Sequence, residues 1–198
     1  MSKKLVIAVV LCIRCFIAFA TQQMPDIITY NGKEYEIGFY VWPMEEYFRT
    51  FPEKRPISEP SSNLWRRYIA AFEIIQNELW VVDIKIIDDR DGMLRAINPD
   101  GTLRFRSVFN EIFSRAGRFK IDWFSGSLIL PQYTRRELAE LRLTNNDIEY
   151  YIKIDIKNGI VHNESIMGKE QYIEYQRERF ENRIEFIPNG GYLIPQSF

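Results

Sequence analysis

The stretch from residue 64 to residue 87, LWRRYIAAFEIIQNELWVVDIKII, indicates the centre of the fold. Two apolar runs, 64–75 and 79–87, flank Gln76-Asn77-Glu78, which predicts two antiparallel strands joined by a tight turn. Apolar residues occupy both faces of each run, unlike a strand with one wet face. We therefore expect this hairpin in the middle of a sheet, with Phe72 opposite Val81 and Ala70 opposite Asp83.

Three dipeptides mark further hairpins: Asn31-Gly32, Ser125-Gly126 and Asn158-Gly159. Asn-Gly tolerates positive φ at both corner positions, as a type I′ turn requires. The predicted strands on either side are 26–30 with 33–37, 119–124 with 127–130, and 150–157 with 160–165.

Helices are fewer than strands, with four predicted. One opens at Pro43 and runs to 51, and a second spans 107–116 before Gly117. The sequence Thr134-Arg135-Arg136-Glu137 matches a capping box and predicts a third helix over 135–143. The fourth is a charged helix over 169–183. Strands joined by hairpins, with helices interspersed, predict an α+β fold: a mainly antiparallel sheet with about four short-to-medium helices.

The first twenty residues have the layout of a secretory signal peptide. Lys3 and Lys4 precede an apolar run that ends at Ala18-Phe19-Ala20, which predicts cleavage after Ala20. A retained N-terminal anchor is the alternative, although the run is short for a membrane span. We expect residues 1–20 to be removed and residues 21–198 to form a single domain in the periplasm or outside the cell, with no membrane span of its own.

Composition narrows the chemistry of the 21–198 segment. Its net charge is −4, because the leader holds three of the 26 basic residues and none of the 27 acidic ones (23 minus 27), so no attraction for nucleic acid is expected. Both cysteines lie in the leader and His162 is the only histidine. Cysteine nucleophiles and Cys/His zinc sites are thereby excluded. Nucleotide-binding glycine loops are absent as well. We expect no metal and no cofactor.

Trp65-Arg66-Arg67-Tyr68 is the candidate binding cluster. If these residues open the central strand, Trp65 and Arg67 point to one face and Arg66 and Tyr68 to the other. An arginine between aromatic walls suits an anionic group. The alternative is that both arginines pair internally with acids placed in strands: Glu73, Asp83 and Asp122.

Those three acids also admit an enzymatic interpretation. Glycoside hydrolases use a pair of carboxylates that flank the scissile bond, and Glu73, Asp83 and Asp122 stand among aromatic residues. No further motif supports this chemistry, because acids on adjacent strands are common in ordinary sheets.

Two other acidic features have weaker patterns. A turn at Asn158-Gly159 would place Asp155 opposite His162, either as an oriented general base or as part of an exposed row of charges. The loop Asp88-Asp89-Arg90-Asp91-Gly92 resembles part of a calcium loop. It lacks carboxylates at the first and twelfth positions, which favours an acidic turn over a metal site.

Two strings, LWRRYIAAFEI at 64–74 and DWFSGSLILP at 122–131, resemble a group of small bacterial α+β proteins over about residues 27–159. That group more often has glycine where Arg67 stands. The resemblance implies a bacterial origin and a single α+β domain, and it transfers no catalytic residue.

Two functions follow as expectations. The first is a non-enzymatic binding or interaction module of the bacterial cell envelope or exterior, with a protein or a glycan as its partner. The second is a small carboxylate-dependent hydrolase that uses the acids of the central sheet. The scarcity of catalytic residue types favours the first.

Overall fold

The computed structural model describes residues 23–38, 41–58, 61–92, 96–115 and 117–184. The expected signal peptide, and with it the expectation of export, lies outside these residues. Within them, no helix is long and apolar enough to cross a membrane.

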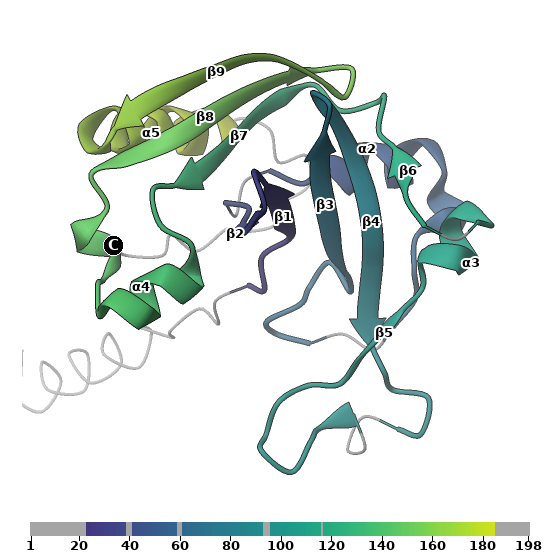
Figure 1. The fold of residues 1–198 in the computed structure, drawn as a ribbon. Helices are drawn as coiled ribbons and strands as arrows, with labels where there is room; N and C mark the ends of the chain where they lie inside the picture. The colour runs from purple at the N-terminus through teal and green to yellow at the C-terminus, as the bar shows by residue number, and fades with distance from the viewer. Residues whose placement is uncertain (1–22, 39–40, 59–60, 93–95, 116, 185–198) are drawn as a thin grey trace, which may run out of the picture.

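A single sheet organises the described chain (Figure 1), with strand order β2-β1-β3-β4-β9-β8-β7 and with β5 and β6 paired to β4. All pairs are antiparallel except β1 with β3, which is parallel. The α+β prediction is therefore confirmed. The strands are β1 (Ile27–Tyr30), β2 (Lys33–Glu36), β3 (Ile69–Ile75), β4 (Glu78–Ile87), β5 (Phe105–Ser107), β6 (Phe119–Lys120), β7 (Gly126–Pro131), β8 (Tyr150–Lys157) and β9 (Ile160–Gly168).

The described helices are α2 (Pro43–Thr50), α3 (Phe109–Phe113), α4 (Arg135–Leu141) and α5 (Lys169–Ile184). All four fall where the sequence predicts helices. The helix predicted over 107–116 is shorter, because its first residue belongs to β5 and Ser114 takes a left-handed conformation that ends it. At α4 the predicted capping box forms, with Thr134 and Glu137 each accepting the other's backbone N–H.

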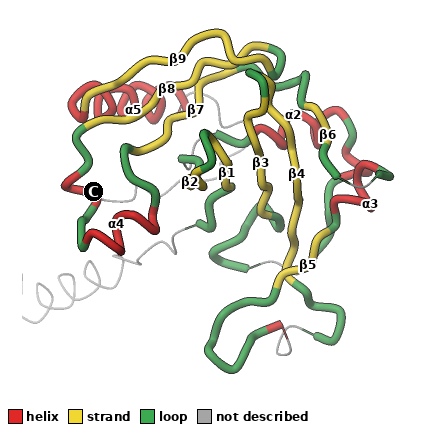
Figure 2. The backbone as a smooth tube through the Cα atoms, in the orientation of Figure 1, coloured by secondary structure: helices red, strands yellow, loops and turns green. Residues whose placement is uncertain are grey.

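Figures 1 and 2 show the layers of the molecule. Strands β3 and β4 run side by side at its centre, and β7, β8 and β9 arch over one end of them. The main apolar core includes buried side chains from both groups of strands, such as Phe72 and Val81 on one side and Leu128 and Ile154 on the other. Helix α5 covers the outer side of β8, where Tyr172 stacks on Tyr151 with ring centroids 3.7 Å apart.

The central hairpin forms around the predicted turn, but its register changes along the strands. Gln76 and Asn77 both have positive φ, and Phe72 pairs with Val81 as predicted. Beyond that pair a bulge inserts one residue, so Ala70 faces Ile84 and the predicted pairing with Asp83 is wrong. The bulge turns Asp83 away from the core face and puts the fully buried Ile84 there instead.

A second bulge corrects the predicted Asp155–His162 pair. The Asn158-Gly159 turn forms as expected, yet Asp155 lies opposite Asn163, because His162 is the extra residue of the bulge. Asp155 accepts hydrogen bonds from Ser127 and Asn163 and pairs with Lys153 at 3.1 Å. This carboxylate is therefore satisfied by neighbours other than the histidine.

The prediction of a hairpin at Ser125-Gly126, joining strands 119–124 and 127–130, is wrong. Strand β6 pairs with β4, whereas β7 pairs with β8. The intervening loop instead encloses the tip of the β8–β9 hairpin. Gly159 donates its N–H to the Phe124 carbonyl at 2.9 Å, and Asn158 donates its N–H to Ser125 Oγ, also at 2.9 Å. These bonds attach the loop to the hairpin tip and satisfy the Phe124 carbonyl and the N–H groups of Asn158 and Gly159.

Tyr30, at the end of β1, ties that strand to β9 through a hydrogen bond from its hydroxyl to Glu164. Burial, with this bond, raises the pKa of Tyr30 to about 12, against 10.0 in the unfolded chain. A raised tyrosine pKa contributes stability that is complete below pH 10 and is lost as pH rises through the folded value. Between about pH 10 and pH 12 the protein is expected to lose about 2 to 3 kcal/mol through this group.

Chemical denaturation of the wild type and Tyr30→Phe across this range tests the effect. The variant lacks the ionisable hydroxyl, so its stability should fall less steeply above about pH 10. Below about pH 9 the two curves should run parallel. Equal slopes over the whole range would assign the alkaline loss to other tyrosines.

Candidate binding groove

The segment 64–68 forms a turn that leads into the central strand. Arg67 donates its N–H to the Leu64 carbonyl at 2.9 Å, and β3 begins only at Ile69. The prediction that this segment opens the strand is therefore wrong, although the predicted alternation holds. Arg66 and Tyr68 are buried, whereas Trp65 and Arg67 are exposed.

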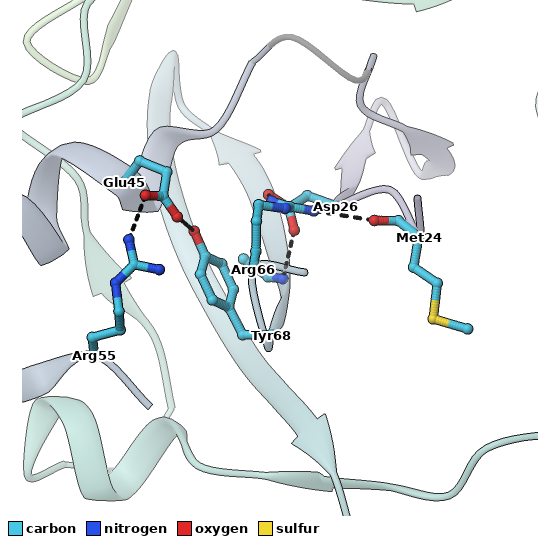
Figure 3. Close-up of polar contacts among 7 residues, drawn as sticks. Met24, Asp26, Glu45, Arg55, Arg66 and Tyr68 are labelled. Carbon is cyan, nitrogen blue, oxygen red and sulfur yellow. Dashed lines mark hydrogen bonds and ion pairs between the residues drawn. The ribbon is translucent and has the colours of Figure 1, made fainter. Parts of the chain in front are cut away.

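Arg66 is held inside the protein by Asp26 (Figure 3). The two side chains are 3% and 1% exposed, and Arg66 Nη1 lies 2.7 Å from Asp26 Oδ2. Arg66 Nη2 also donates to the Met24 carbonyl at 3.1 Å. The second carboxylate oxygen of Asp26 accepts the Ala70 N–H at 2.8 Å. The pair thus joins the residues before β1 to the start of β3.

A second part of this network contains Tyr68 and Glu45 (Figure 3). The Tyr68 hydroxyl donates to Glu45 Oε1 at 2.8 Å, and Arg55 pairs with the other oxygen of Glu45. The Arg66 guanidinium lies over the Tyr68 ring, 5.3 Å from its centroid. Burial raises the pKa of the Tyr68 hydroxyl well above its ordinary value, so the hydroxyl stays protonated and donates.

Internal pairing of Arg66 was one of the two alternatives for this cluster, and the structure places its partner outside the predicted set. The acid is Asp26 and not Glu73, Asp83 or Asp122. Asp26 directly precedes β1, and its separation from Arg66 by forty residues (66 minus 26) leaves no local pattern. The parallel pairing of β1 with β3 brings them together. An acid just ahead of an apolar strand is the one signal that sequence offers.

A groove of about 340 Å³ lies beside this network, lined by Pro52, Glu53, Arg55, Pro56, Ile57, Trp65, Arg66 and Arg67. Its apolar side chains are unusually open to solvent, with Ile57 85% exposed and Trp65 49% exposed. Phe51, next to the lining, is 44% exposed. Exposed apolar side chains gathered beside charged ones are typical of interaction surfaces.

Arg67 differs from the other two arginines of the groove. Arg55 pairs with Glu45 and Arg66 pairs with Asp26, whereas Arg67 forms no ion pair within the described residues. Its φ is +69°, in the left-handed region that non-glycine residues seldom adopt. The buried hydroxyl of Ser58 donates to the Arg67 carbonyl at 3.0 Å and fixes this conformation.

Arg67→Gly is expected to stabilise the protein by about 0.5 to 1 kcal/mol, because glycine adopts the left-handed conformation without a Cβ penalty. Urea denaturation of the variant and of the wild type measures the difference. Ser58→Ala is the companion variant, and it should destabilise, since it removes the hydrogen bond that fixes the turn. A loss of stability in Arg67→Gly would show that the side chain has a structural role.

The three predicted acids are not all on one face of the sheet. Glu73 lies opposite Trp80, and Asp83 lies opposite Ala71 on the same half-buried face. Asp83 accepts a hydrogen bond from Ser107 at 2.6 Å and lies 3.7 Å from Lys85. Asp122 follows β6 in a loop and is exposed. Asp83 is thus bonded to its neighbours, and Asp122 lies outside the sheet.

Metal ligands are not gathered anywhere in the described part of the chain, where no three His, Cys, Asp or Glu side chains are positioned to hold an ion. In the acidic loop after β4, Asp88 binds the Arg90 guanidinium through both carboxylate oxygens. This ion pair lowers the pKa of Asp88.

Comparison of the chain with protein-family models, with curated proteins and with solved structures finds no match. The functional argument therefore depends on the groove alone.

Proposed function

We propose that the protein is an exported, non-enzymatic binding module of the bacterial cell envelope or exterior, and that it holds its partner in the groove beside Trp65 and Arg67. The observation that carries the proposal is an arginine without an ion pair among the described residues, next to exposed apolar side chains on a fixed turn. Rigid presentation of such side chains lowers the entropic cost of binding.

The buried network supports this role by fixing the turn from beneath. Arg66 and Tyr68 point inward to Asp26 and Glu45, so the intervening Arg67 and the preceding Trp65 face outward. Trp65 also contacts Trp42 edge to face, with ring centroids 5.4 Å apart. A tryptophan and an arginine held in this way are the residue types that dominate binding energy in protein interfaces.

The hydrolase alternative has less support. A glycoside hydrolase needs two carboxyl groups that face each other across an open cleft. Asp83 is engaged by Ser107 and Lys85, and none of Glu73, Asp83 and Asp122 lines the groove.

Differential capture tests the proposal. Wild type, Trp65→Ala and Ile173→Ala are immobilised and exposed to the same bacterial envelope extract. Ile173 is the matched control, because it is 51% exposed on α5 and does not line the groove. We expect a component that wild type and Ile173→Ala retain, and that Trp65→Ala loses by about tenfold or more.

Equal retention by all three proteins would contradict the groove as the binding site. A complete absence of retained material would contradict the binding function itself. Turnover of a glycoside substrate that disappears in Glu73→Gln would favour the hydrolase instead.

A further inference from the structure

We propose that the occupant of the groove is a segment of a partner protein that presents one carboxylate side chain next to apolar residues, with Arg67 as the group that binds the carboxylate. This inference rests on the proposed function and names the class of partner.

The charged residues of the groove indicate which group of the partner binds there. Three guanidinium groups line it, but those of Arg55 and Arg66 are already bound to Glu45 and Asp26. Arg67 is left as the arginine of the lining with no ion pair to a described residue. An arginine suits a carboxylate because its planar fork can donate two parallel hydrogen bonds.

Glu53 limits how many acids the ligand can carry. It lines the same groove and would repel a second carboxylate close to the first. The lining therefore favours a single acid and not an acidic run.

The remaining walls determine what flanks the acid. Pro52, Pro56, Ile57 and Trp65 provide apolar surface, and Ile57 is almost entirely open to solvent. Covering such side chains requires an apolar partner surface, and their burial is what makes it favourable. An aliphatic or proline side chain beside the acid supplies that surface.

A glycan fits the same lining less well. Sugars present many hydroxyl groups, each of which needs a hydrogen-bond partner when it is removed from water. Among the described residues, the lining of the groove includes no asparagine, glutamine, serine or threonine, and two of its three arginines are bound internally. The lining thus matches a protein segment better than a carbohydrate.

The conformation of Arg67 supports a role for its side chain. The backbone at φ +69° is strained for arginine, and Ser58 holds it there. Glycine would remove the strain, so arginine at this position lowers stability. The exposed side chain forms no ion pair with a described residue, so the strain supports a role for Arg67 in binding.

The test uses two sets of short synthetic peptides, one with a single Asp or Glu flanked by Leu, Ile or Pro, and a matched set with Asn or Gln. Binding to the wild type is followed by intrinsic tryptophan fluorescence and by calorimetry. Acidic peptides should bind, and their Asn or Gln counterparts should bind about tenfold to a hundredfold more weakly.

Arg67→Gly provides the decisive comparison. Its affinity for the acidic peptides should fall by the same factor, and its affinity for the neutral peptides should equal that of the wild type. The variant should also unfold at a higher temperature than the wild type. Such a double-mutant cycle assigns the coupling to the Arg67–carboxylate pair. Arg67→Lys should retain part of the affinity, because it keeps the charge but not the planar fork.

Two results would overturn the inference and are distinct from failure of the proposed function. Equal affinity for the acidic and neutral peptides would exclude the carboxylate. Binding of a uronic-acid oligosaccharide in place of any peptide, abolished by Trp65→Ala, would replace the protein partner by a glycan and leave the binding function standing. If no peptide, oligosaccharide or component of the envelope extract binds, both the inference and the proposed function are wrong.

Discussion

Gly159→Ala is expected to prevent the protein from folding, with a loss of more than about 4 kcal/mol. A Cβ built at Gly159 would lie 1.6 Å from the Ile121 carbonyl oxygen and 2.6 Å from its carbon. Both contacts are with backbone, so no side-chain rotation can relieve them. The residue also has φ +73°, where alanine is strained even in open space.

The position of Gly159 explains why the effect is global. Its carbonyl accepts the Leu79 N–H at 2.8 Å and its N–H donates to Phe124 at 2.9 Å. The tip of the β8–β9 hairpin therefore joins β4 to the loop before β7. Moving this tip to admit a methyl group would separate the arch of β7, β8 and β9 from the central strands (Figure 1).

Gly32 is a matched control within the same chain. It occupies the same position of an Asn-Gly turn and has the same φ of +73°, but nothing lies within 4 Å of a Cβ built there. Gly32→Ala should cost about 1 kcal/mol, which is the conformational term alone. Circular dichroism and thermal unfolding of both variants separate the steric term from the conformational one. Similar losses in both would contradict the close approach at Ile121.

The sequence predicts the elements of this fold better than their register. Asn-Gly turns and capping boxes depend only on residues close together in sequence. The turn at Asn158-Gly159 and the helix start at Thr134 could therefore be predicted. The two bulges depend on which side chain the core accepts. In β4 the core position opposite Ala70 is taken by the apolar Ile84 and not by the charged Asp83. No local sequence pattern predicts the extra residue that shifts the register.

The candidate site shows the same division. The alternation of Trp65, Arg66 and Arg67 between exposed and buried positions follows from local geometry. The partner of Arg66 does not, because Asp26 reaches it only through the parallel pairing of β1 with β3. Long-range pairing through a crossover is decided by the packing of the whole domain, which a single sequence does not display.

Asp26→Ala is expected to be the second most damaging substitution, with a loss of about 3 to 5 kcal/mol. It removes the carboxylate that binds the buried guanidinium of Arg66 and the Ala70 N–H. Arginine stays charged throughout the accessible pH range. Arg66 would therefore keep a buried charge without a carboxylate partner, although it would still donate a hydrogen bond to the Met24 carbonyl.

Arg66→Met should cost less than Asp26→Ala, because a carboxyl group can take up a proton. Burial raises the pKa of Asp26, while Arg66 and the Ala70 N–H oppose the rise. Without Arg66 the pKa should rise further. A raised folded-state pKa gives stability that is complete below the unfolded value of 3.8 and is lost as pH rises. Arg66→Met should thus be more stable near about pH 4 than near about pH 7.

Urea denaturation of both single variants and of the double variant, at these two pH values, measures how much of each loss in stability comes from leaving one charge of the pair without its partner. The double variant should recover part of the loss of Asp26→Ala, since replacing both charges by apolar groups removes the uncompensated one. Arg90→Met is the control, because Arg90 pairs with Asp88 on the surface and should leave stability essentially unchanged. If Asp26→Ala is no more costly than Arg66→Met, the guanidinium reaches water and the pair does not anchor the turn that presents Arg67.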